Sequence, residues 1–202
     1  MIVRNVSPAP LKHPMFWILA LTLLPIIIGL VLYFSAWSPT GPGNHGELIR
    51  PAQKIPNVSL RTLDGKPFDF GSLKNLWVML YLDVPGCNPV CQKNLFNMRQ
   101  VHVATDKHVA RVRRVFVLSQ PASAEQVSGI QKKYPDLLLV SGDNSQIQAL
   151  ANQLPRQVGS AVGQDIYLMD PQGYLILRYA PTVNPSGLLK DLNRLLTYSW
   201  VG

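Results

Sequence analysis

The chain holds two cysteines, Cys87 and Cys91, which lie close together in the segment VPGCNPVCQKN. Two thiols with three residues between them can form a disulfide, exchange it with a partner, or bind a soft metal ion. Asn88 is a favoured N-cap residue and Pro89 a favoured first helical residue, so we expect a helix to begin between the cysteines. Both sulfurs would then lie near the positive end of a helix dipole, which stabilises the reactive thiolate.

The two cysteines are predicted to differ in their roles. Cys87 precedes the helix, whereas Cys91 falls at its third position. We therefore expect Cys87 to be the more exposed, attacking sulfur and Cys91 to be the resolving sulfur. Pro85 and Gly86 are expected to shape the loop before Cys87, because glycine allows a tight turn and leaves the neighbouring thiol uncovered.

Three interpretations of the cysteine pair remain open. A structural disulfide suits an exported domain, but a bridge that closes a loop of about five residues constrains the unfolded chain little. Dithiol–disulfide exchange needs only the two sulfurs and access to them. The third interpretation is copper binding, because thiolates select Cu(I) and an added histidine would also allow Cu(II) to bind. Zinc would need about four ligands, which the sequence does not offer nearby.

An uncharged apolar segment, Met15 to Trp37, precedes the cysteines. About 23 residues can cross roughly 30 Å of hydrocarbon, and this is longer than the apolar region of a cleaved signal peptide, the main alternative. Arg4 and Lys12 lie before the segment, and no Lys or Arg follows it until Arg50. The positive-inside rule then predicts a cytoplasmic N-terminus and an exported C-terminal part. We predict a single-pass protein of the bacterial inner membrane with a periplasmic domain.

The predicted organisation has four parts. Residues 1–14 form a cytoplasmic tail and residues 15–37 an anchor that is held in the lipid bilayer. Residues 38–56, rich in Pro and Gly, form an extended tether with little regular structure. Residues 57–202 form the periplasmic domain.

The formal net charge of +8 is carried by scattered residues, apart from the run ARVRRV at 110–115. We interpret this run as a strand whose Arg111 and Arg113 point to solvent. The alternative is a small basic patch that docks to an acidic membrane partner or to lipid headgroups. Nucleic-acid binding is not expected of an exported domain without a recognition motif.

Strand and helix patterns alternate after the tether. A hairpin at the Asp64-Gly65 turn comes first, and the apolar run 76–83 then predicts a strand buried on both faces. The elements predicted beyond it are the cysteine helix, a strand at 112–119, a helix capped by Ser123 and Gln126, a strand and helix within 136–154, a hairpin at 165–180 and a helix from Asn184-Pro185. This order predicts an α/β, thioredoxin-like three-layer sandwich with a mixed sheet and an extra N-terminal β-hairpin, preceded by one transmembrane helix. The late hairpin disfavours a flavodoxin-like fold, the main alternative.

The anchor, the tether and four segments together resemble the Sco/SenC proteins; the segments are IPNVSLRTLDGKPFDF, LWVMLYLD, GCNPVC and DIYLMDPQGYL. The resemblance covers about residues 50–198, and its most specific element is the cysteine pair with three intervening residues. It implies a membrane-anchored thioredoxin-fold factor that assembles the dinuclear copper centre of cytochrome c oxidase. It also implies copper binding or thiol reduction at Cys87 and Cys91.

One feature of the chain departs from that resemblance. The family has a third copper ligand, a histidine, shortly before the strand that matches IYLMDPQG, whereas this chain reads VGSAVGQDIYLMD there. Gln164 and Asp165 are the nearest polar residues, and we expect them to line the wall opposite the cysteines. The histidines lie elsewhere, at His13, His45, His102 and His108.

These observations predict thiol–disulfide exchange in cytochrome c oxidase biogenesis, with Cu(I) handling by the two thiolates as a secondary activity and no required cofactor. The expected partner is the oxidase subunit with the dinuclear copper centre, or another periplasmic thiol protein. A general periplasmic thiol–disulfide reductase, for example in cytochrome c maturation, is one alternative, and a non-catalytic partner of a membrane complex is another. Whether the protein is an enzyme, as a thiol–disulfide oxidoreductase, stays open.

Overall fold

The computed structural model describes residues 14–35, 43–82, 87–119, 123–156, 163–181 and 184–199. The chain divides into two compact units, Met1–Gly43 and Asn44–Gly202.

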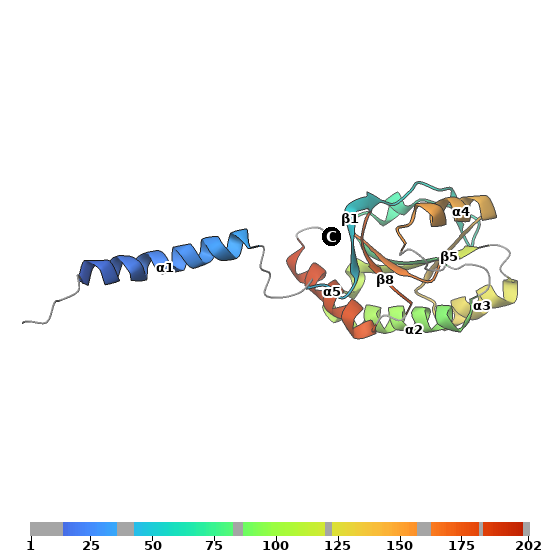
Figure 1. Ribbon diagram of the computed structural model, residues 1–202. Coiled ribbons are helices and arrows are strands. Elements are labelled where there is room, and N and C mark those ends of the chain that lie inside the picture. The colour runs from blue at the N-terminus through green and yellow to red at the C-terminus, as the bar shows by residue number, and fades with distance from the viewer. Residues whose placement is uncertain are drawn as a thin grey trace, which may run out of the picture. The chain divides into compact units, whose positions relative to one another are not determined.

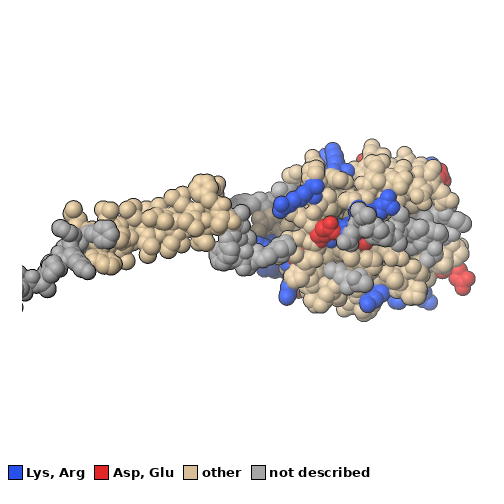
Figure 2. Space-filling model, viewed as in Figure 1, with Lys and Arg blue, Asp and Glu red and all other residues tan. Residues whose placement is uncertain are grey.

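The first unit contains the helix α1 (Pro14–Phe34). Its segment Trp17–Phe34 is the one helix of the described chain that is long and apolar enough to cross a membrane, judged by length and composition. Figure 2 shows this helix without charged side chains. The Thr22 hydroxyl donates to the carbonyl of Ile18 at 3.1 Å, so its polar group is satisfied within the helix, as hydrocarbon requires.

The second unit is built on one sheet of eight strands in the order β1-β8-β7-β4-β5-β6-β2-β3. Neighbouring pairs β4–β5 and β5–β6 are parallel and the other pairs are antiparallel. The sheet is therefore mixed, as predicted. The strands are β1 (Glu47–Lys54), β2 (Leu60–Thr62), β3 (Pro67–Phe68), β4 (Trp77–Leu82), β5 (Val112–Ser119), β6 (Leu138–Gly142), β7 (Ile166–Met169) and β8 (Tyr174–Tyr179).

Helices cover both faces of this sheet. Helices α2 (Pro89–Ala104), α3 (Ala124–Lys133) and α5 (Pro185–Tyr198) lie on one face, and α4 (Asn144–Gln153) lies on the other (Figure 1). The described residues also form two short 3₁₀ helices, η1 (Phe70–Leu73) and η2 (Asp106–Arg111). The three-layer, thioredoxin-like α/β architecture expected from the sequence is confirmed.

The central strand β4 shows why its sequence is apolar throughout. All six of its side chains are buried. Met79 and Tyr81 pack into the core under α2, α3 and α5, whereas Val78 and Leu80 pack into the core on the opposite face. A strand buried on both faces has no solvent side, so its sequence does not alternate.

The tether expected at 38–56 is too long, because Glu47–Lys54 form the edge strand β1. β1 pairs antiparallel with β8, with Glu47 opposite Arg178 and an irregularity between Leu48 and Gln53. Pro51 lies inside that irregularity. An edge strand tolerates a proline because one side of it needs no partner, so Pro51 made this segment resemble a linker.

A buried carboxylate fixes the first residues of the second unit to α5. Asp191 Oδ2 accepts hydrogen bonds from the backbone N–H groups of His45, at 2.8 Å, and Gly46, at 2.9 Å. It also accepts one from the Tyr179 hydroxyl at 3.0 Å. A side chain at Gly46 would meet the Tyr179 ring at 2.6 Å, so this close approach requires glycine. Burial, reinforced by the Asp191 charge, raises the pKa of Tyr179 and keeps its hydroxyl a donor.

A second buried charge lies in the arginine run. Arg114 on β5 is fully buried and forms an ion pair with Asp136, whose carboxylate is half exposed. Arg113 is exposed, as expected. The prediction for Arg111 is wrong, because this residue ends η2 rather than lying in the strand, and its guanidinium donates to the Leu196 carbonyl at 2.9 Å. The C-terminal helix thus binds one arginine of the run, which is partly buried, and the core fully buries another.

Replacing Asp191 by Ala should destabilise the second unit by about 2–4 kcal/mol, because two backbone N–H groups and a buried hydroxyl lose their acceptor. The measurement is denaturant unfolding of the full-length protein in detergent, followed by tryptophan fluorescence. Asp191→Asn keeps an acceptor oxygen in place and should lose distinctly less of the free energy of unfolding. Equal losses in the two variants would instead assign the effect to the negative charge.

Replacing Asp136 by Asn should destabilise the protein by about 1–3 kcal/mol at pH 7, because Arg114 keeps its buried charge and loses its carboxylate. Burial opposes the ionisation of Asp136, but the hydrogen bond and charge of Arg114 outweigh it and hold the pKa of Asp136 below its usual 3.8.

The contribution of Asp136 to stability is therefore complete above pH 3.8, the usual pKa of its carboxyl group. It is lost as the pH falls through the lower pKa that this group has in the folded state. The stabilities of the parent and of Asp136→Asn should converge below that value in unfolding curves measured across pH. A difference that is constant with pH would contradict this assignment.

Candidate functional site

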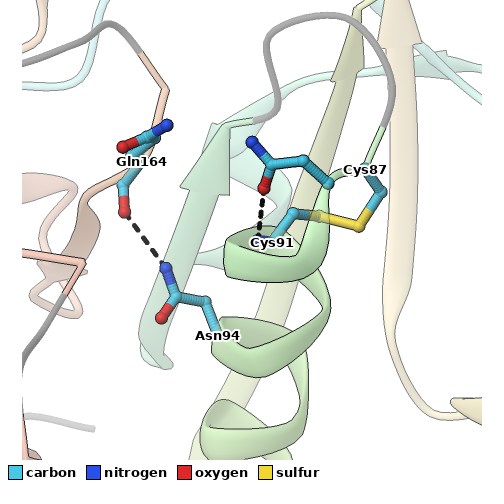
Figure 3. Close-up of a disulfide and its surroundings, with 5 residues drawn as sticks. Cys87, Cys91, Asn94 and Gln164 are labelled. Atoms are coloured by element: carbon cyan, nitrogen blue, oxygen red, sulfur yellow. Dashed lines mark hydrogen bonds between the residues drawn. A yellow bond between two sulfur atoms is a disulfide. The ribbon is translucent and has the colours of Figure 1, made fainter.

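Cys87 and Cys91 form a disulfide at the N-terminus of α2, with their Cα atoms 5.2 Å apart (Figure 3). That separation is in the usual range for a bridged pair. The loop that joins β4 to this bridge lies outside the described residues, and so do Pro85 and Gly86, for which a loop-shaping role was predicted.

The start of α2 is set by two residues between the cysteines. Asn88 is the N-cap, and its side-chain oxygen accepts a hydrogen bond from the backbone N–H of Cys91 at 3.0 Å. Pro89 occupies the first helical turn, where its missing N–H costs nothing. The prediction that the helix begins between the cysteines is confirmed. The bridge therefore lies at the positive end of the helix dipole, an environment that favours thiolates once the bridge is reduced.

The two sulfur-bearing residues differ in accessibility. Cys91 is 1% exposed and belongs to the core that includes Tyr81 and Leu95. Cys87 is partly exposed and packs against the edge of the same core. A molecule arriving from solvent can therefore reach Cys87, whereas Cys91 is covered by the protein.

A hydrogen bond joins α2 to the segment before β7. The side-chain amide of Asn94 donates to the backbone carbonyl of Gln164 at 3.1 Å, as Figure 3 shows. Asn94 is fully buried and lies one helical turn beyond Cys91. Gln164 therefore stands across from the cysteine helix, joined to it through its backbone. Asn94 was not predicted from the sequence, although a polar residue on the buried face of this helix was a usable signal.

The carboxylate of Asp165 is directed elsewhere. It is buried, and its Oδ2 accepts from Nη1 of Arg178 on β8 at 2.8 Å. Arg178 also pairs with Glu47 on β1. Leu177 and Tyr179 pack into the core that contains Cys91, and the alternation of a strand places Arg178 on the opposite face. Asp165 thus balances a buried arginine.

The described histidines are held by other partners. His45 lies against Asp191, with Nδ1 and Oδ1 at 3.1 Å. His102 is buried, with Nε2 at 3.1 Å from each of the carbonyl oxygens of Val109 and Val112. His108 lies 3.4 Å from the Arg111 guanidinium. Within the described ranges no group of three or more His, Cys, Asp or Glu residues could hold a metal ion. His13 lies outside those ranges.

A groove of about 240 Å³ opens beside Cys87, between α2 and α3. Sequence patterns did not predict it, because a groove depends on how two helices pack. We call it the α2–α3 groove; among its lining residues are Cys87, Leu95, Gly129, Ile130, Lys133 and Tyr134.

Comparison with solved structures finds Sco proteins as structural neighbours. ScoI of Arabidopsis thaliana with copper bound is 19% identical, with a TM-score of 0.60 over 71% of this chain and 98% of its own. Apo Sco1 of Thermus thermophilus is 19% identical, with a TM-score of 0.62 over 77% and 99%. BsSco, a cytochrome c oxidase assembly protein of the Sco family with a disulfide switch, is 16% identical, with a TM-score of 0.57 over 74% and 96%.

These neighbours confirm the predicted resemblance to Sco/SenC proteins at the level of the fold. No curated protein matches the sequence. A family model described as the transmembrane-like, thioredoxin-like, C-terminal domain matches residues 77–199, which span β4 to the end of α5 and include both cysteines. Because that match covers more than half of the chain, the protein belongs to the family of transmembrane-like, thioredoxin-like C-terminal domains.

Proposed function

We propose that this protein is a membrane-anchored, periplasmic factor of the Sco/SenC type that acts in cytochrome c oxidase biogenesis by thiol–disulfide exchange. The observation that carries the proposal is the Cys87–Cys91 bridge at the start of α2, with one residue accessible and the other buried. A bridge whose loop is this short adds little stability, so a reversible role explains it better than a structural one.

The reaction begins with the reduced pair. The Cys87 thiolate attacks one sulfur of a partner disulfide, forms a mixed disulfide and releases the other partner sulfur as a thiolate. The Cys91 thiolate then attacks the sulfur of Cys87, which closes the intramolecular bridge and releases the second partner thiol. Two electrons pass from the cysteine pair to the partner, whose disulfide becomes a dithiol. Protons lost by the two cysteines end on the two partner sulfurs.

The next cycle requires an upstream dithiol protein. One of its thiolates attacks the exposed Cys87 sulfur and displaces Cys91, and its second thiolate then resolves the mixed disulfide. The dipole of α2 assists the displacement. Cys91 lies in the first helical turn, so its sulfur leaves as a thiolate near the positive end of the helix. The same geometry thus serves both halves of the cycle.

The location and the partner follow from the rest of the chain. α1 supplies the apolar span. Arg4 and Lys12 before it favour an N-terminus in the cytoplasm, which leaves the cysteines in the periplasm. Among the structural neighbours, BsSco belongs to a family of cytochrome c oxidase assembly proteins. This likeness supports an oxidase subunit as the partner.

Cu(I) is proposed as a secondary cargo. The neighbours from Arabidopsis thaliana and Bradyrhizobium japonicum have copper bound. In this chain the donors that fit are the two cysteine sulfurs, which would hold Cu(I) as thiolates after reduction. A histidine ligand from residues 157–162 is excluded by their sequence, QVGSAV. The donor set therefore suits Cu(I) in a two-sulfur site and suits Cu(II) poorly.

Cys87→Ser should lose exchange with a small disulfide such as oxidised glutathione, because a hydroxyl does not replace the attacking thiolate. The rate should fall to that of a reaction without protein. Thiol release by the reduced full-length protein in detergent is the measurement.

The matched variant is Cys91→Ser, which keeps the attacking sulfur but cannot resolve the intermediate. It should accumulate a mixed disulfide at Cys87, detected as a mass increase that dithiothreitol reverses. If Cys87→Ser accumulated the mixed disulfide instead, Cys91 would be the attacking cysteine and Cys87 the resolving one. Full cellular function after replacement of both cysteines would reject exchange altogether.

Anaerobic titration with Cu(I), against a competing chelator, should show one ion bound per reduced full-length protein. Cys87→Ser and Cys91→Ser should each lose this binding, since a single thiolate is left. Binding retained in both variants would place the metal elsewhere. Tight binding of Cu(II) would contradict the two-sulfur donor set.

A further inference from the structure

We propose that the α2–α3 groove binds an extended segment of the exchange partner, which carries an acidic side chain about three to five residues from the cysteine that meets Cys87. This inference rests on the proposed exchange function. The proposed recognition surface extends from the accessible sulfur along the cysteine helix.

The groove includes the accessible cysteine. Cys87 lines one part of it, and Lys133 and Tyr134 line another, so a molecule in the groove reaches the accessible sulfur. Gln92 on α2 and Gln126 on α3 also line it. An extended chain exposes backbone N–H and C=O groups, and the Gln92 side-chain amide can both donate to and accept from them. The Gln126 oxygen already accepts from the Ser123 backbone N–H.

The groove has an apolar middle. Leu95 and Ile130 line it, and Phe96 on the adjoining face of α2 is 50% exposed. Phe96 follows Gln92 by one helical turn, so the two lie on the same side of α2. Phe96 therefore adds apolar surface on the side of α2 that carries Gln92. A partner segment with an apolar side chain in its middle fits this surface.

Gly129 leaves part of the groove wall without a side chain. It lies in the interior of α3 and lines the groove, and a Cβ atom at this position would meet no atom within 4 Å. Glycine in a helix interior is disfavoured relative to alanine, and nothing within the described chain needs the space that it leaves. The missing side chain keeps the groove wide enough for an occupant.

The charge at the far part of the groove selects the occupant. The Lys133 ammonium lies 5.5 Å from the centre of the Tyr134 ring, and the Arg99 guanidinium lies 6.0 Å from it. Neither cation has a carboxylate partner among the described ion pairs. Asp136, two residues beyond Tyr134, is already paired with Arg114. Lys133, which lines the groove, and Arg99, which lies beside the same ring, therefore offer positive charge to an acidic side chain.

The length of α2 gives the spacing. Arg99 is ten residues beyond Pro89, which corresponds to about 15 Å of helix, and its side chain leans back toward the N-terminus. An extended peptide covers about 3.3 Å per residue. An acidic side chain about three to five residues from the reacting cysteine therefore reaches the cations while that cysteine reaches Cys87.

The test measures binding and chemistry separately. Fluorescent peptides with an apolar centre carry serine in place of cysteine and glutamate four residues away on either side, and matched peptides carry glutamine instead. Anisotropy with the full-length oxidised protein in detergent should show a preference of about threefold to tenfold for glutamate at low ionic strength, the size expected for two exposed ion pairs.

Each variant has a matched neighbour on α3. Lys133→Glu should abolish the preference for glutamate, whereas Lys132→Glu makes the same charge change outside the groove and should retain most of it. Gly129→Leu should fill the groove and weaken both peptides, while Ser128→Leu should not. The Cβ atom of a residue at position 129 meets open space, and the change removes a helix glycine, so thermal unfolding should show an unchanged or more stable fold.

Exchange with oxidised glutathione separates the two proposals. Retained exchange without peptide binding, or binding that Gly129→Leu and Lys133→Glu do not change, overturns the groove assignment and leaves the exchange function intact. Selective peptide binding without exchange upholds the groove and rejects the exchange function. Equal effects of Lys132→Glu and Lys133→Glu would show that the preference for glutamate depends only on overall charge, and this would reject the groove as the binding site.

Discussion

The position at which α2 begins is the constraint on which the candidate site depends. Asn88 accepts from the Cys91 N–H, and Pro89 follows it, so the first turn starts between the two sulfurs. Cys91 is thereby carried into the core, and Cys87 stays on the accessible side of the bridge. A helix that began one turn earlier would hold both residues on helical backbone. The difference in access between the two cysteines comes from this single cap.

The pairing of strands in the sheet then determines which residues lie near the N-cap of α2. β4 ends just before the cysteine loop, and β7 pairs with it antiparallel, with Tyr81 opposite Ile166. Residues that precede Ile166 therefore lie beside the end of β4, which brings Gln164 within reach of Asn94 on α2. The register of one strand pair thus defines the wall facing the cysteine helix. Asp165 turns to the other face, where Arg178 neutralises it.

Signals carried by neighbouring residues were predictable, and contacts between distant residues were not. Asn88-Pro89 and Asn184-Pro185 each start a helix where the sequence indicates, because a cap depends on three or four adjacent residues. β1 was missed because Pro51 breaks a strand pattern unless the strand is known to lie at an edge. The burial of Arg114 depends on Asp136, and a pairing of residues so far apart has no local pattern.

Within the described residues no histidine joins the cysteines in a group that could hold a metal ion, and this changes how copper and redox chemistry relate in the proposed function. His45 and His102 are engaged by Asp191 and by backbone carbonyls, so recruiting either to a metal would break contacts that hold the fold. Both proposed activities then depend on the same two sulfurs. Because a disulfide has no thiolate to offer, oxidation excludes Cu(I), and bound Cu(I) in turn occupies the sulfurs that exchange requires. The redox state of the Cys87–Cys91 pair would therefore determine which of the two activities is available.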